Sequence, residues 1–287
     1  MQPLQTIQQG STGQAVIQWQ EFLLQHGYVI VGTADGIFGK NTNTATIAFQ
    51  TTAGLTADGV VGSHTYAAAM ALGFNSPALP QTASYLGIDL YHGDGAINWG
   101  EVKTDPQNIQ FAYLKATEGT GFVDPAFAPN RAAAAAVAMP TGAYHFYHPE
   151  LSPIDQANFF CRIIASLQPS DLPPALDFEP VNLMGVTLAQ AISDLNTFLH
   201  TVQTILGKKP VIYTNYNSWV NVLENPTSFN SYPLWIASYN ATPPNLFGGW
   251  TEWAIWQYTD GGAVNGVPNN TVDMNRYNTN SGLIQST

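Results

Sequence analysis

Cysteine and positive charge are both scarce in this sequence, and each shortage excludes a class of protein. Cys161 is the only cysteine among 287 residues, so no disulfide can form within the chain. It lies in an apolar run, where a cysteine is typically a small buried side chain. Eight lysine and arginine residues stand against 19 acidic ones, for a formal net charge of −11. Because phosphate contacts need basic side chains, we expect no nucleic-acid partner.

Long apolar stretches are missing as well. No segment approaches about 18 consecutive apolar residues, so the sequence predicts no transmembrane helix and no membrane partner. The first residues, Met-Gln-Pro-Leu-Gln-Thr, lack the basic and apolar regions of a signal peptide, and none is predicted.

The composition is rich in apolar and in uncharged polar residues. Hydrophobic residues make up 45% and aromatic residues 12%, enough for a sizeable core, whereas charged residues are only 9%. The polar surface must therefore consist mainly of Asn, Gln, Thr and Ser. Such a surface suits a protein that contacts carbohydrate through hydrogen bonds and aromatic faces.

One short stretch, Ala175-Leu176-Asp177-Phe178-Glu179-Pro180, carries the strongest chemical signal. It is typical of a buried strand that ends in two acidic side chains. Side chains alternate along a strand, so Asp177 and Glu179 share one face while Leu176 and Phe178 share the other. Neighbouring carboxylates discourage each other's ionisation, which raises one of the two pKa values. A carboxylic acid that keeps its proton near neutral pH is what general-acid cleavage of a glycosidic bond requires. Taken alone, the motif also fits a solvated acidic turn.

Residues 1–74 contain an internal repeat. The segment 33–42 is echoed by the segment 56–65, and each copy has an Asp-Gly turn, an apolar residue, a second glycine and a polar residue before a helix. Another helix is expected from about Gln14 to Gln25, where apolar residues recur at helical spacing. The sequence thus predicts a small domain of three short helices joined by glycine turns.

Several motifs of this segment match a known family. They are Gly10-Ser11-x-Gly13-x-x-Val16, Gln20-x-x-Leu23, Gly27-Tyr28, Asp35-Gly36-x-Phe38-Gly39, Phe49-Gln50, Gly54-Leu55, and Asp58-Gly59-x-Val61-Gly62. The segment resembles the peptidoglycan-binding domains found beside many cell-wall hydrolases. The resemblance implies a groove for a fragment of the bacterial cell wall, without saying which residues touch it. Residues 75–84 contain two prolines and no periodicity, so we expect a linker there.

Residues 85–279 alternate between short apolar runs and helical stretches. This alternation predicts an α/β fold with parallel strands, and eight strands suggest a TIM-like barrel. The connections 239–252 and 259–271 lack a helical pattern, so we expect an irregular barrel with about five helices and none near its C-terminal end. Residues 280–287 are assigned to a C-terminal tail. The expected strands are Tyr85–Leu90, Gln110–Ala116, Thr141–Tyr147, Ala175–Phe178, Pro210–Thr214, Pro233–Ser238, Trp253–Tyr258 and Val272–Tyr277. The expected helices are about Pro125 to Val137, Pro153 onward, Thr187 to Gly207 and Asn217 to Glu224.

Acidic and aromatic side chains gather at the ends of these strands, where barrels carry their working residues. Asp89 is near the end of the first strand, and Asp177 and Glu179 end the fourth. Asp273 starts the last strand, a position that parallel strands do not explain. One aromatic stripe is more often core than binding site, but aromatic rings beside four carboxyl groups favour a sugar cleft. The aromatic residues proposed to bind substrate are Tyr91, Tyr144, Tyr213, Trp235, Tyr239 and Trp256.

A second set of motifs matches another family along nearly the whole segment. They are Gly87-Ile88-Asp89, Ile97-Asn98-Trp99, Leu114-Lys115-Ala116-Thr117-Glu118-Gly119, Gly142-x-Tyr144-His145-Phe146, Leu176-Asp177-Phe178-Glu179, Ile212-Tyr213-Thr214, Leu234-Trp235-Ile236-Ala237, Ile255-Trp256-Gln257-Tyr258 and Val272-Asp273-Met274-Asn275-Arg276. The segment resembles the family 25 glycoside hydrolases, which are lysozymes (N-acetylmuramidases) with an eight-stranded, five-helix barrel. It departs from the family after the first aspartate, where it has Leu90-Tyr91-His92-Gly93 instead of a small polar residue and Gln-Gly.

The resemblance implies a role for each acid. Glu179 matches the proton donor to the glycosidic oxygen, and Asp177 matches its partner, which stabilises developing positive charge or orients the 2-acetamido group of the substrate. Asp89 and Asp273 complete the acidic site. The implied reaction is hydrolysis of the β-1,4 bond between N-acetylmuramic acid and N-acetylglucosamine. Whether the product is retained or inverted stays open.

Other chemistry is less well supported. His145 and His148 suggest a metal site, but residues i and i+3 of a strand face opposite sides, and no cluster has zinc spacing. We therefore expect no metal, no cofactor and no zinc amidase, and we interpret Lys115 and Glu118 as structural partners near the cleft. We expect a monomer whose partners are peptidoglycan glycan strands in the bacterial cell wall.

Two alternatives remain: a barrel glycosidase acting on chitin, and a non-catalytic wall-binding protein. Action on a wall outside the cell requires either a leader that has been trimmed or a lysin released when a membrane is breached.

Overall fold

The computed structural model describes residues 6–74, 85–168, 170–239, 243–269 and 271–283. The chain divides into two compact units, residues 1–81 and 82–287, and each is described by itself. The expected linker at 75–84 lies outside the described residues, as do the last four residues of the expected tail. Thr279–Ser281 form a 3₁₀ turn, and Leu283 packs against apolar side chains inside the barrel.

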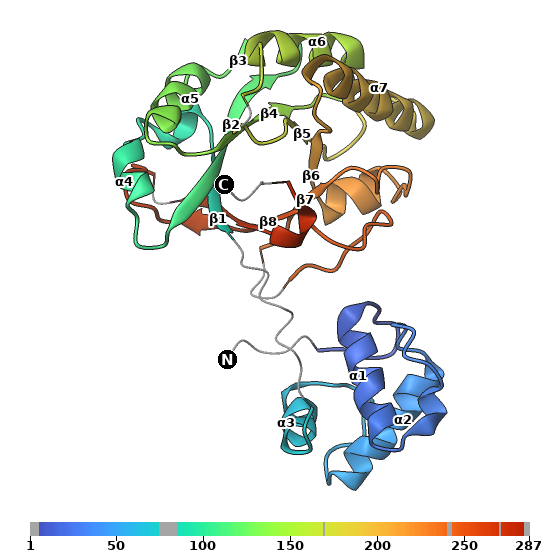
Figure 1. Ribbon diagram of the computed structural model, residues 1–287. Coiled ribbons are helices and arrows are strands. Elements are labelled where there is room, and N and C mark those ends of the chain that lie inside the picture. Colours follow the sequence, from blue (N-terminus) through green and yellow to red (C-terminus); the bar gives the residue numbers. More distant parts are fainter. Residues whose placement is uncertain (1–5, 75–84, 169, 240–242, 270, 284–287) are drawn as a thin grey trace. The chain divides into compact units, whose positions relative to one another are not determined.

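The first unit consists of three α-helices, as predicted: α1 (Gln14–Gln25), α2 (Lys40–Thr52) and α3 (Ser63–Ala71) (Figure 1). A short 3₁₀ helix, η1 (Val29–Val31), follows α1. The core centres on Trp19, whose ring contacts four other aromatic rings at centroid distances of 5.3–5.9 Å. One of these is Phe74, so the packed part of this unit extends to the last described residue before position 85.

In each copy of the repeat, a buried glutamine forms hydrogen bonds to the Asp-Gly turn. The Gln20 side chain accepts the backbone N–H of the glycine in the first Asp-Gly turn at 2.9 Å and donates to Asp35 at 2.9 Å. Gln50 makes the same two bonds in the second copy, with Asp58 as the acceptor, both at 2.9 Å. Each amide also bonds a threonine at the start of the next helix. The repeated sequence therefore encodes a repeated hydrogen-bonded turn.

The second unit is a closed barrel of eight strands, as predicted (Figure 1). The strands follow one another around the barrel in chain order, and the last pairs with the first. A ninth strand, β3 (Phe122–Val123), extends the end of β2 as a short antiparallel hairpin. The barrel strands are β1 (Tyr85–Leu90), β2 (Ile109–Glu118), β4 (Thr141–Phe146), β5 (Ala175–Asp177), β6 (Val211–Asn215), β7 (Leu234–Ala237), β8 (Ile255–Gly262) and β9 (Val272–Tyr277).

Strand β9 differs from the parallel strands that the alternation predicts. Strands β1 to β8 of the barrel pair in parallel, whereas β9 is antiparallel to both β8 and β1. The physical reason is the length of the connection before β9: residues 263–271 are fewer than the dozen or so that a crossover between parallel neighbours needs, whereas the connection before β8 is longer. The start of β9 therefore lies at the mouth where the parallel strands end, which explains the position of Asp273.

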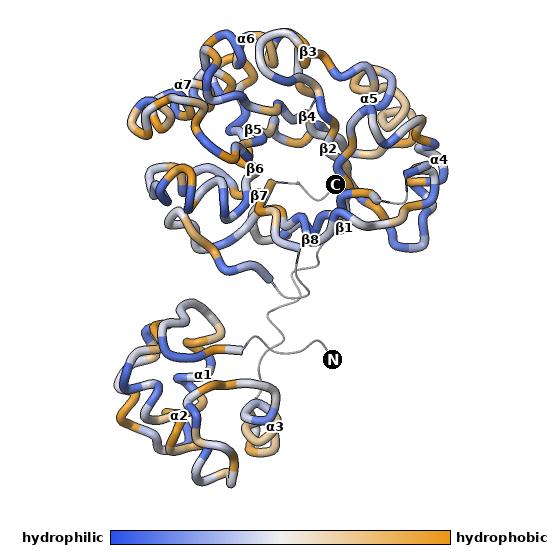
Figure 2. The backbone as a smooth tube through the Cα atoms, turned by 180° about the vertical axis from the view of Figure 1, so that it is seen from behind, coloured by the Kyte–Doolittle hydropathy of each residue, from blue (hydrophilic) through white to orange (hydrophobic). Residues whose placement is uncertain are grey.

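Among the described residues, four α-helices and one π-helix surround the barrel: α4 (Trp99–Lys103), α5 (Phe127–Ala136), α6 (Pro153–Ile164), α7 (Leu188–Leu206) and the π-helix η3 (Asn217–Val222) (Figure 1). A 3₁₀ helix, η2 (His92–Asp94), follows β1. In the described parts of the connections before β8 and before β9 there is no helix, as expected. Figure 2 shows apolar and polar stretches alternating along α6 and α7. Among the described residues, none of the helices is both long enough and apolar enough to cross a membrane.

Side chains of each strand alternate between the barrel interior and the layer beneath the helices. In β5, Ala175 packs inside the barrel, whereas Leu176 and the following Phe178 belong to the outer apolar cluster. The intervening positions, Asp177 and Glu179, are therefore directed toward the barrel mouth. The interior cluster below them contains Phe111, Tyr113, Ala175, Val211, Tyr213, Trp235, Ile255 and Tyr277.

Candidate active site

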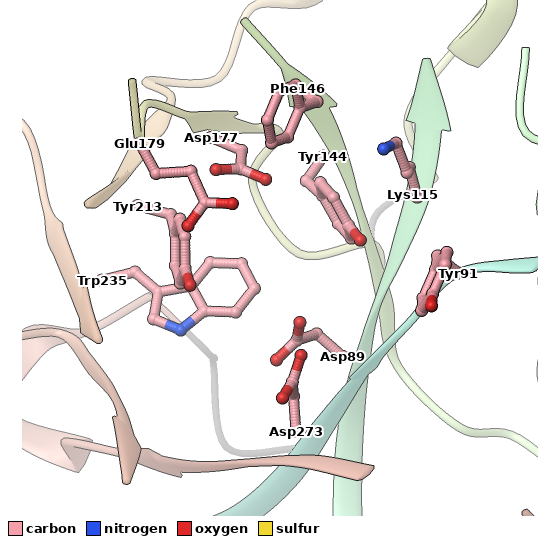
Figure 3. Close-up of a pocket in the computed structure, with 10 residues that line it drawn as sticks. All are labelled: Asp89, Tyr91, Lys115, Tyr144, Phe146, Asp177, Glu179, Tyr213, Trp235 and Asp273. Atoms are coloured by element: carbon pink, nitrogen blue, oxygen red, sulfur yellow. The ribbon is translucent and has the colours of Figure 1, made fainter. Parts of the chain in front are cut away.

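A pocket of about 200 Å³ lies at the mouth where the parallel strands end. Residues from seven strands or the turns that follow them contribute to it, and all four predicted acids are among them (Figure 3). Its lining is Asp89, Tyr91, Lys115, Tyr144, Phe146, Asp177, Glu179, Tyr213, Trp235 and Asp273.

Asp177 and Glu179 form one acidic pair. Asp177 is the last residue of β5 and is 7% exposed, and Glu179 follows it on the same side. Sheet-like pairing continues past the strand, because the Phe178 N–H donates to the Tyr213 carbonyl at 2.9 Å and the Tyr147 N–H donates to the Asp177 carbonyl at 3.0 Å. This backbone pairing fixes both acids. Figure 3 shows their carboxyl groups pointing toward one another on one side of the pocket.

Burial favours the protonated form of both acids. It raises the pKa of Glu179, against the opposing influence of the Lys115 charge and the Tyr213 hydroxyl. It also raises the pKa of Asp177, and the charge of Glu179 adds to that rise. The Asp177 Oδ1 atom is buried and has no hydrogen-bond partner among the described residues. Since buried polar atoms are nearly always paired, this unpaired atom marks the Asp177 carboxyl group as a functional group of the pocket that it lines.

Asp89 and Asp273 form a second acidic pair on the opposite side of the pocket (Figure 3). They are cross-strand neighbours in the antiparallel register of β1 and β9. Burial, followed by the charge of Asp273, raises the pKa of Asp89. Burial, followed by the charge of Asp94, raises the pKa of Asp273 to about 6. These acids hold a proton more tightly than ordinary aspartates do.

A chain of buried amides holds Asp89 in place. Gln257 and Asn275 both donate to its Oδ2 atom, at 2.9 and 2.7 Å. The Trp235 indole N–H donates to Asn275 at 2.7 Å. The Tyr213 hydroxyl donates to Gln257 at 2.9 Å. The aromatic wall and the acid are therefore parts of one hydrogen-bonded network, in which the two amides were not predicted as site residues.

The predicted aromatic residues divide into three groups. Four of the six line the pocket, namely Tyr91, Tyr144, Tyr213 and Trp235. Tyr239 is not part of the lining, but its hydroxyl reaches the same network and donates to Gln257 at 3.0 Å.

Trp256 does not reach the pocket, contrary to expectation. Its ring lies in the apolar cluster outside the barrel, 6.0 Å from the rings of both Trp253 and Tyr258, and its N–H donates to the Ser238 carbonyl. Alternation along β8 explains this, since Gln257 faces inward and Trp256 must then face outward.

Lys115 and Phe146 were not predicted to line the pocket. The Lys115 ammonium lies 4.8 Å from the centre of the Phe146 ring and 2.7 Å from the Glu118 carboxylate. Glu118 in turn lies 3.1 Å from His148. The ion pair of Lys115 and Glu118 is therefore present, and its cation also faces the acidic pocket (Figure 3).

No group of His, Cys, Asp and Glu side chains in the described part of the chain could hold a metal ion. His145 is fully buried and its ring nitrogens bond Thr117 at 2.7 Å and Gln156 at 3.2 Å. Burial lowers the pKa of His145 to about 4, so the ring is neutral. Both nitrogens have protein partners, which leaves His145 with a structural role.

The arrangement can protonate a leaving oxygen while surrounding a ring-shaped substrate with aromatic faces. Two carboxyl pairs with raised pKa values supply the proton and accept hydroxyl or amide hydrogens. Paired carboxyl groups of this kind are what glycoside hydrolysis requires.

Comparisons with known proteins agree with this geometry. Residues 88–267 match the glycosyl hydrolases family 25, and residues 12–69 match the peptidoglycan-binding domain family. Lysozyme M1 of Streptomyces globisporus is 35% identical over 208 residues, which is 69% of this chain and 69% of that protein. The N,O-diacetylmuramidase of Chalaropsis is 30% identical over 172 residues, covering 56% of this chain and 82% of the other. The crystal structure of a bacterial lysozyme from Streptomyces coelicolor aligns with a TM-score of 0.64 at 33% identity, covering 68% of this chain and 92% of that one.

Proposed function

The chain belongs to glycosyl hydrolase family 25, and on that premise we propose that it is a muramidase that carries its own wall-binding domain. It hydrolyses the β-1,4 bond between N-acetylmuramic acid and N-acetylglucosamine in peptidoglycan. The observation that carries this function is the pairing of Asp177 and Glu179 in one pocket with aromatic walls. The similarity to lysozymes and a diacetylmuramidase supports the bond that is cut.

Glu179 is the proton donor. Burial raises its pKa, which favours the protonated form, and its side chain is less buried than that of Asp177. It transfers this proton to the glycosidic oxygen as the bond from that oxygen to C1 of N-acetylmuramic acid breaks. In the hydrolytic step, the Glu179 carboxylate takes a proton from the attacking water, which restores the acid.

Asp177 acts on the 2-acetamido group of the same sugar. Its carboxyl group lines the pocket, and in its ionised form it accepts the N–H of that group. This orients the amide carbonyl toward C1. The carbonyl oxygen bonds to C1 as the bond between C1 and the glycosidic oxygen breaks. Water then opens the resulting ring from the opposite face, so the first-formed product keeps the β configuration. Proton NMR of the first-formed anomer tests this step, because an α anomer would assign the reaction to direct attack by water.

Asp89 and Asp273 hold the substrate from the other side of the pocket. Their cross-strand position and the rise in both pKa values support a pair that shares a proton. Such a pair both donates to and accepts from sugar hydroxyl groups. The amides of Gln257 and Asn275 keep Asp89 oriented for this contact.

The wall-binding domain, residues 1–74, anchors the enzyme to the bacterial cell wall, and residues 75–84 connect it to the catalytic domain, residues 85–279. The match of residues 12–69 to peptidoglycan-binding domains supports this division. The protein acts as a monomer on a wall outside the cell membrane, without a cofactor. The small number of basic side chains supports the absence of a nucleic-acid partner.

Mass spectrometry of reduced wall digests tests the function directly. A muramidase leaves fragments whose reducing end is N-acetylmuramitol, whereas a glucosaminidase would leave N-acetylglucosaminitol. Digestion of chitin oligomers separates the chitin-type alternative, for which they would be cleaved as readily as walls. A wall suspension that keeps its turbidity, while the protein sediments with it, would instead identify a non-catalytic wall-binding protein.

A further inference from the structure

The exposed aromatic side chains of the described residues are not scattered over the surface. Four phenylalanine or tyrosine side chains are between 41% and 58% exposed: Tyr91, Phe122, Tyr216 and Tyr239. Each of them follows the end of a parallel strand or pairs with it, so all four lie at the mouth that holds the pocket. Exposed apolar groups gathered around a cleft typically mark a ligand groove.

The four residues fall into two groups on opposite sides of the barrel. Tyr91 and Phe122 belong to the ends of β1 and β2, whereas Tyr216 and Tyr239 follow β6 and β7. In the order of the eight strands around the barrel, these two pairs of strands are half a turn apart. A linear ligand that contacts both groups therefore crosses the mouth and the pocket between them.

The group at β1 and β2 is extended by a histidine. The ring of His92 lies 5.2 Å from that of Tyr91 and 5.7 Å from that of Phe122, so three rings form a continuous surface, which we term the aromatic platform. The platform is continuous with the pocket, since Tyr91 lines both, and the Lys115 ammonium of the pocket lies 6.0 Å from the Phe122 ring.

Buried groups hold the platform in place. Asp124, which is 1% exposed, accepts both the His92 ring N–H at 2.8 Å and the His92 backbone N–H at 3.1 Å. Asp94 accepts the backbone N–H of Tyr91 at 2.8 Å. A side chain at Gly93 would overlap the Tyr91 ring, because an added Cβ atom would lie 2.3 Å from it. The two buried carboxylates therefore fix the His92 ring and the backbone at Tyr91, and the glycine leaves room for the Tyr91 ring.

We propose that the aromatic platform of Tyr91, His92 and Phe122 binds a sugar of the glycan strand that lies beyond the sugars held in the pocket. This rests on the proposed function, because the occupant is the continuation of the strand that is cut. The apolar face of an N-acetylhexosamine stacks on an aromatic ring, and this contact needs no charge. The platform also lies where the sequence departs from its family, at Tyr91-His92, so it sets the strand-length preference of this enzyme.

The test compares substrates that differ only in length. Peptide-free glycan strands are prepared by removing the stem peptides from a wall, and the tetrasaccharide and octasaccharide are purified. For the wild-type enzyme, kcat/KM is expected to be higher for the octasaccharide. In Phe122→Ala and in His92→Ala, the ratio of the two values falls by roughly three- to tenfold, which corresponds to the loss of one aromatic contact. Phe122→Trp keeps the ring and restores the ratio.

The matched control is Ile205→Ala, which removes an equally exposed apolar side chain from α7 and keeps the wild-type ratio. An unchanged ratio in both platform variants would overturn the proposal, as would a loss seen only with strands that still carry stem peptides, because the platform would then bind peptide. These results differ from a failure of the proposed function, in which the wild-type enzyme would cleave neither strand.

Discussion

Asp89 and Asp273 face each other across β1 and β9, the first and last strands of the barrel. The two carboxyl groups meet only because β9 runs against its neighbours. A parallel β9 would carry Asp273 to the opposite end of the barrel, away from the pocket. The reversed strand thus supplies one of the four acids of the site.

Glu179→Gln tests the proton donor. The substitution keeps the size of the side chain but removes the transferable proton, so turnover is expected to fall by about two to four orders of magnitude. The measurement is the rate of turbidity loss of a wall suspension, with sedimentation to show that wall binding persists. Glu252→Gln, at an exposed glutamate, is the control and stays fully active. Retention of more than about a tenth of the activity would exclude Glu179 as the donor.

Lys115→Met tests how the pocket sets its working pH. The Lys115 charge lowers the pKa of both Asp177 and Glu179, so its removal raises both values. The proposed mechanism uses ionised Asp177 and protonated Glu179, so both limbs of the pH profile of kcat/KM are expected to move toward higher pH. Glu118 and His148 adjoin the lysine and keep contact with each other in the variant. Lys115→Arg preserves the charge and is expected to preserve the profile. A profile that stays in place in the methionine variant would show that Lys115 only packs against Phe146.

Asp273→Asn tests how the second acidic pair affects the stability of the barrel. Burial raises the pKa of Asp273 to about 6, above the value of about 3.9 in an unfolded chain. The folded barrel therefore binds more protons than the unfolded chain between these values, and its free energy of unfolding falls as the pH rises through this window. The variant lacks this pH dependence. Its free energy of unfolding therefore rises by about 2 kcal/mol relative to that of the wild type between pH 4 and pH 7.

Calorimetry of the barrel transition at the two pH values measures this difference. The gain corresponds to a relative rise in Tm of roughly 4–8 °C. Asp194→Asn, at a partly exposed position of α7, is the control and shows no such change. Equal pH dependence in the wild type and Asp273→Asn would show that Asp273 is fully ionised at pH 4.

Gln50→Ala tests the repeated turn of the first unit. The substitution leaves the N–H of the Asp-Gly turn without its acceptor and removes the bond to Asp58, so we expect a loss of about 2–4 kcal/mol in the stability of this unit alone. The thermal transition of the first unit and the fraction bound to walls should both decrease, while cleavage of soluble glycan strands is unchanged. Gln25→Ala, at the exposed end of α1, is the comparison and should match the wild type. A destabilised barrel would contradict the independence of the two units.

The sequence was sufficient to place Asp177 and Glu179 in the pocket because their strand is bounded by apolar residues on the other face. Leu176 and Phe178 identify the buried outer side, and alternation then determines where the acids point. The same rule misled at Trp256. Apolar and polar residues do not alternate clearly along β8. We therefore assigned Trp256 to the barrel mouth, although it is Gln257 that faces the mouth. An assignment shifted by one residue reverses every side chain of a strand.

Other features depend on contacts that no local pattern contains. The register that places Asp273 opposite Asp89 is set by the pairing of β9 with β1, which is distant in the sequence. Helix α4 has only five residues, too few for an apolar period, and it was not predicted. Asn275 and Gln257 become part of the site only because both amides converge on Asp89. Single polar residues in strands carry no signal of that convergence.

The adjacency of β1 and β9 also links hydrolytic competence to the synthesis of residues 272–277. The sheet can close only after residues 272–277 have left the ribosome, because these residues form the strand that joins its two edges. A polypeptide that stops earlier carries Glu179 but lacks Asp273, and its two unpaired edges can recruit other strands. Chains that end before β9 are therefore expected to be inert toward a wall and prone to aggregate.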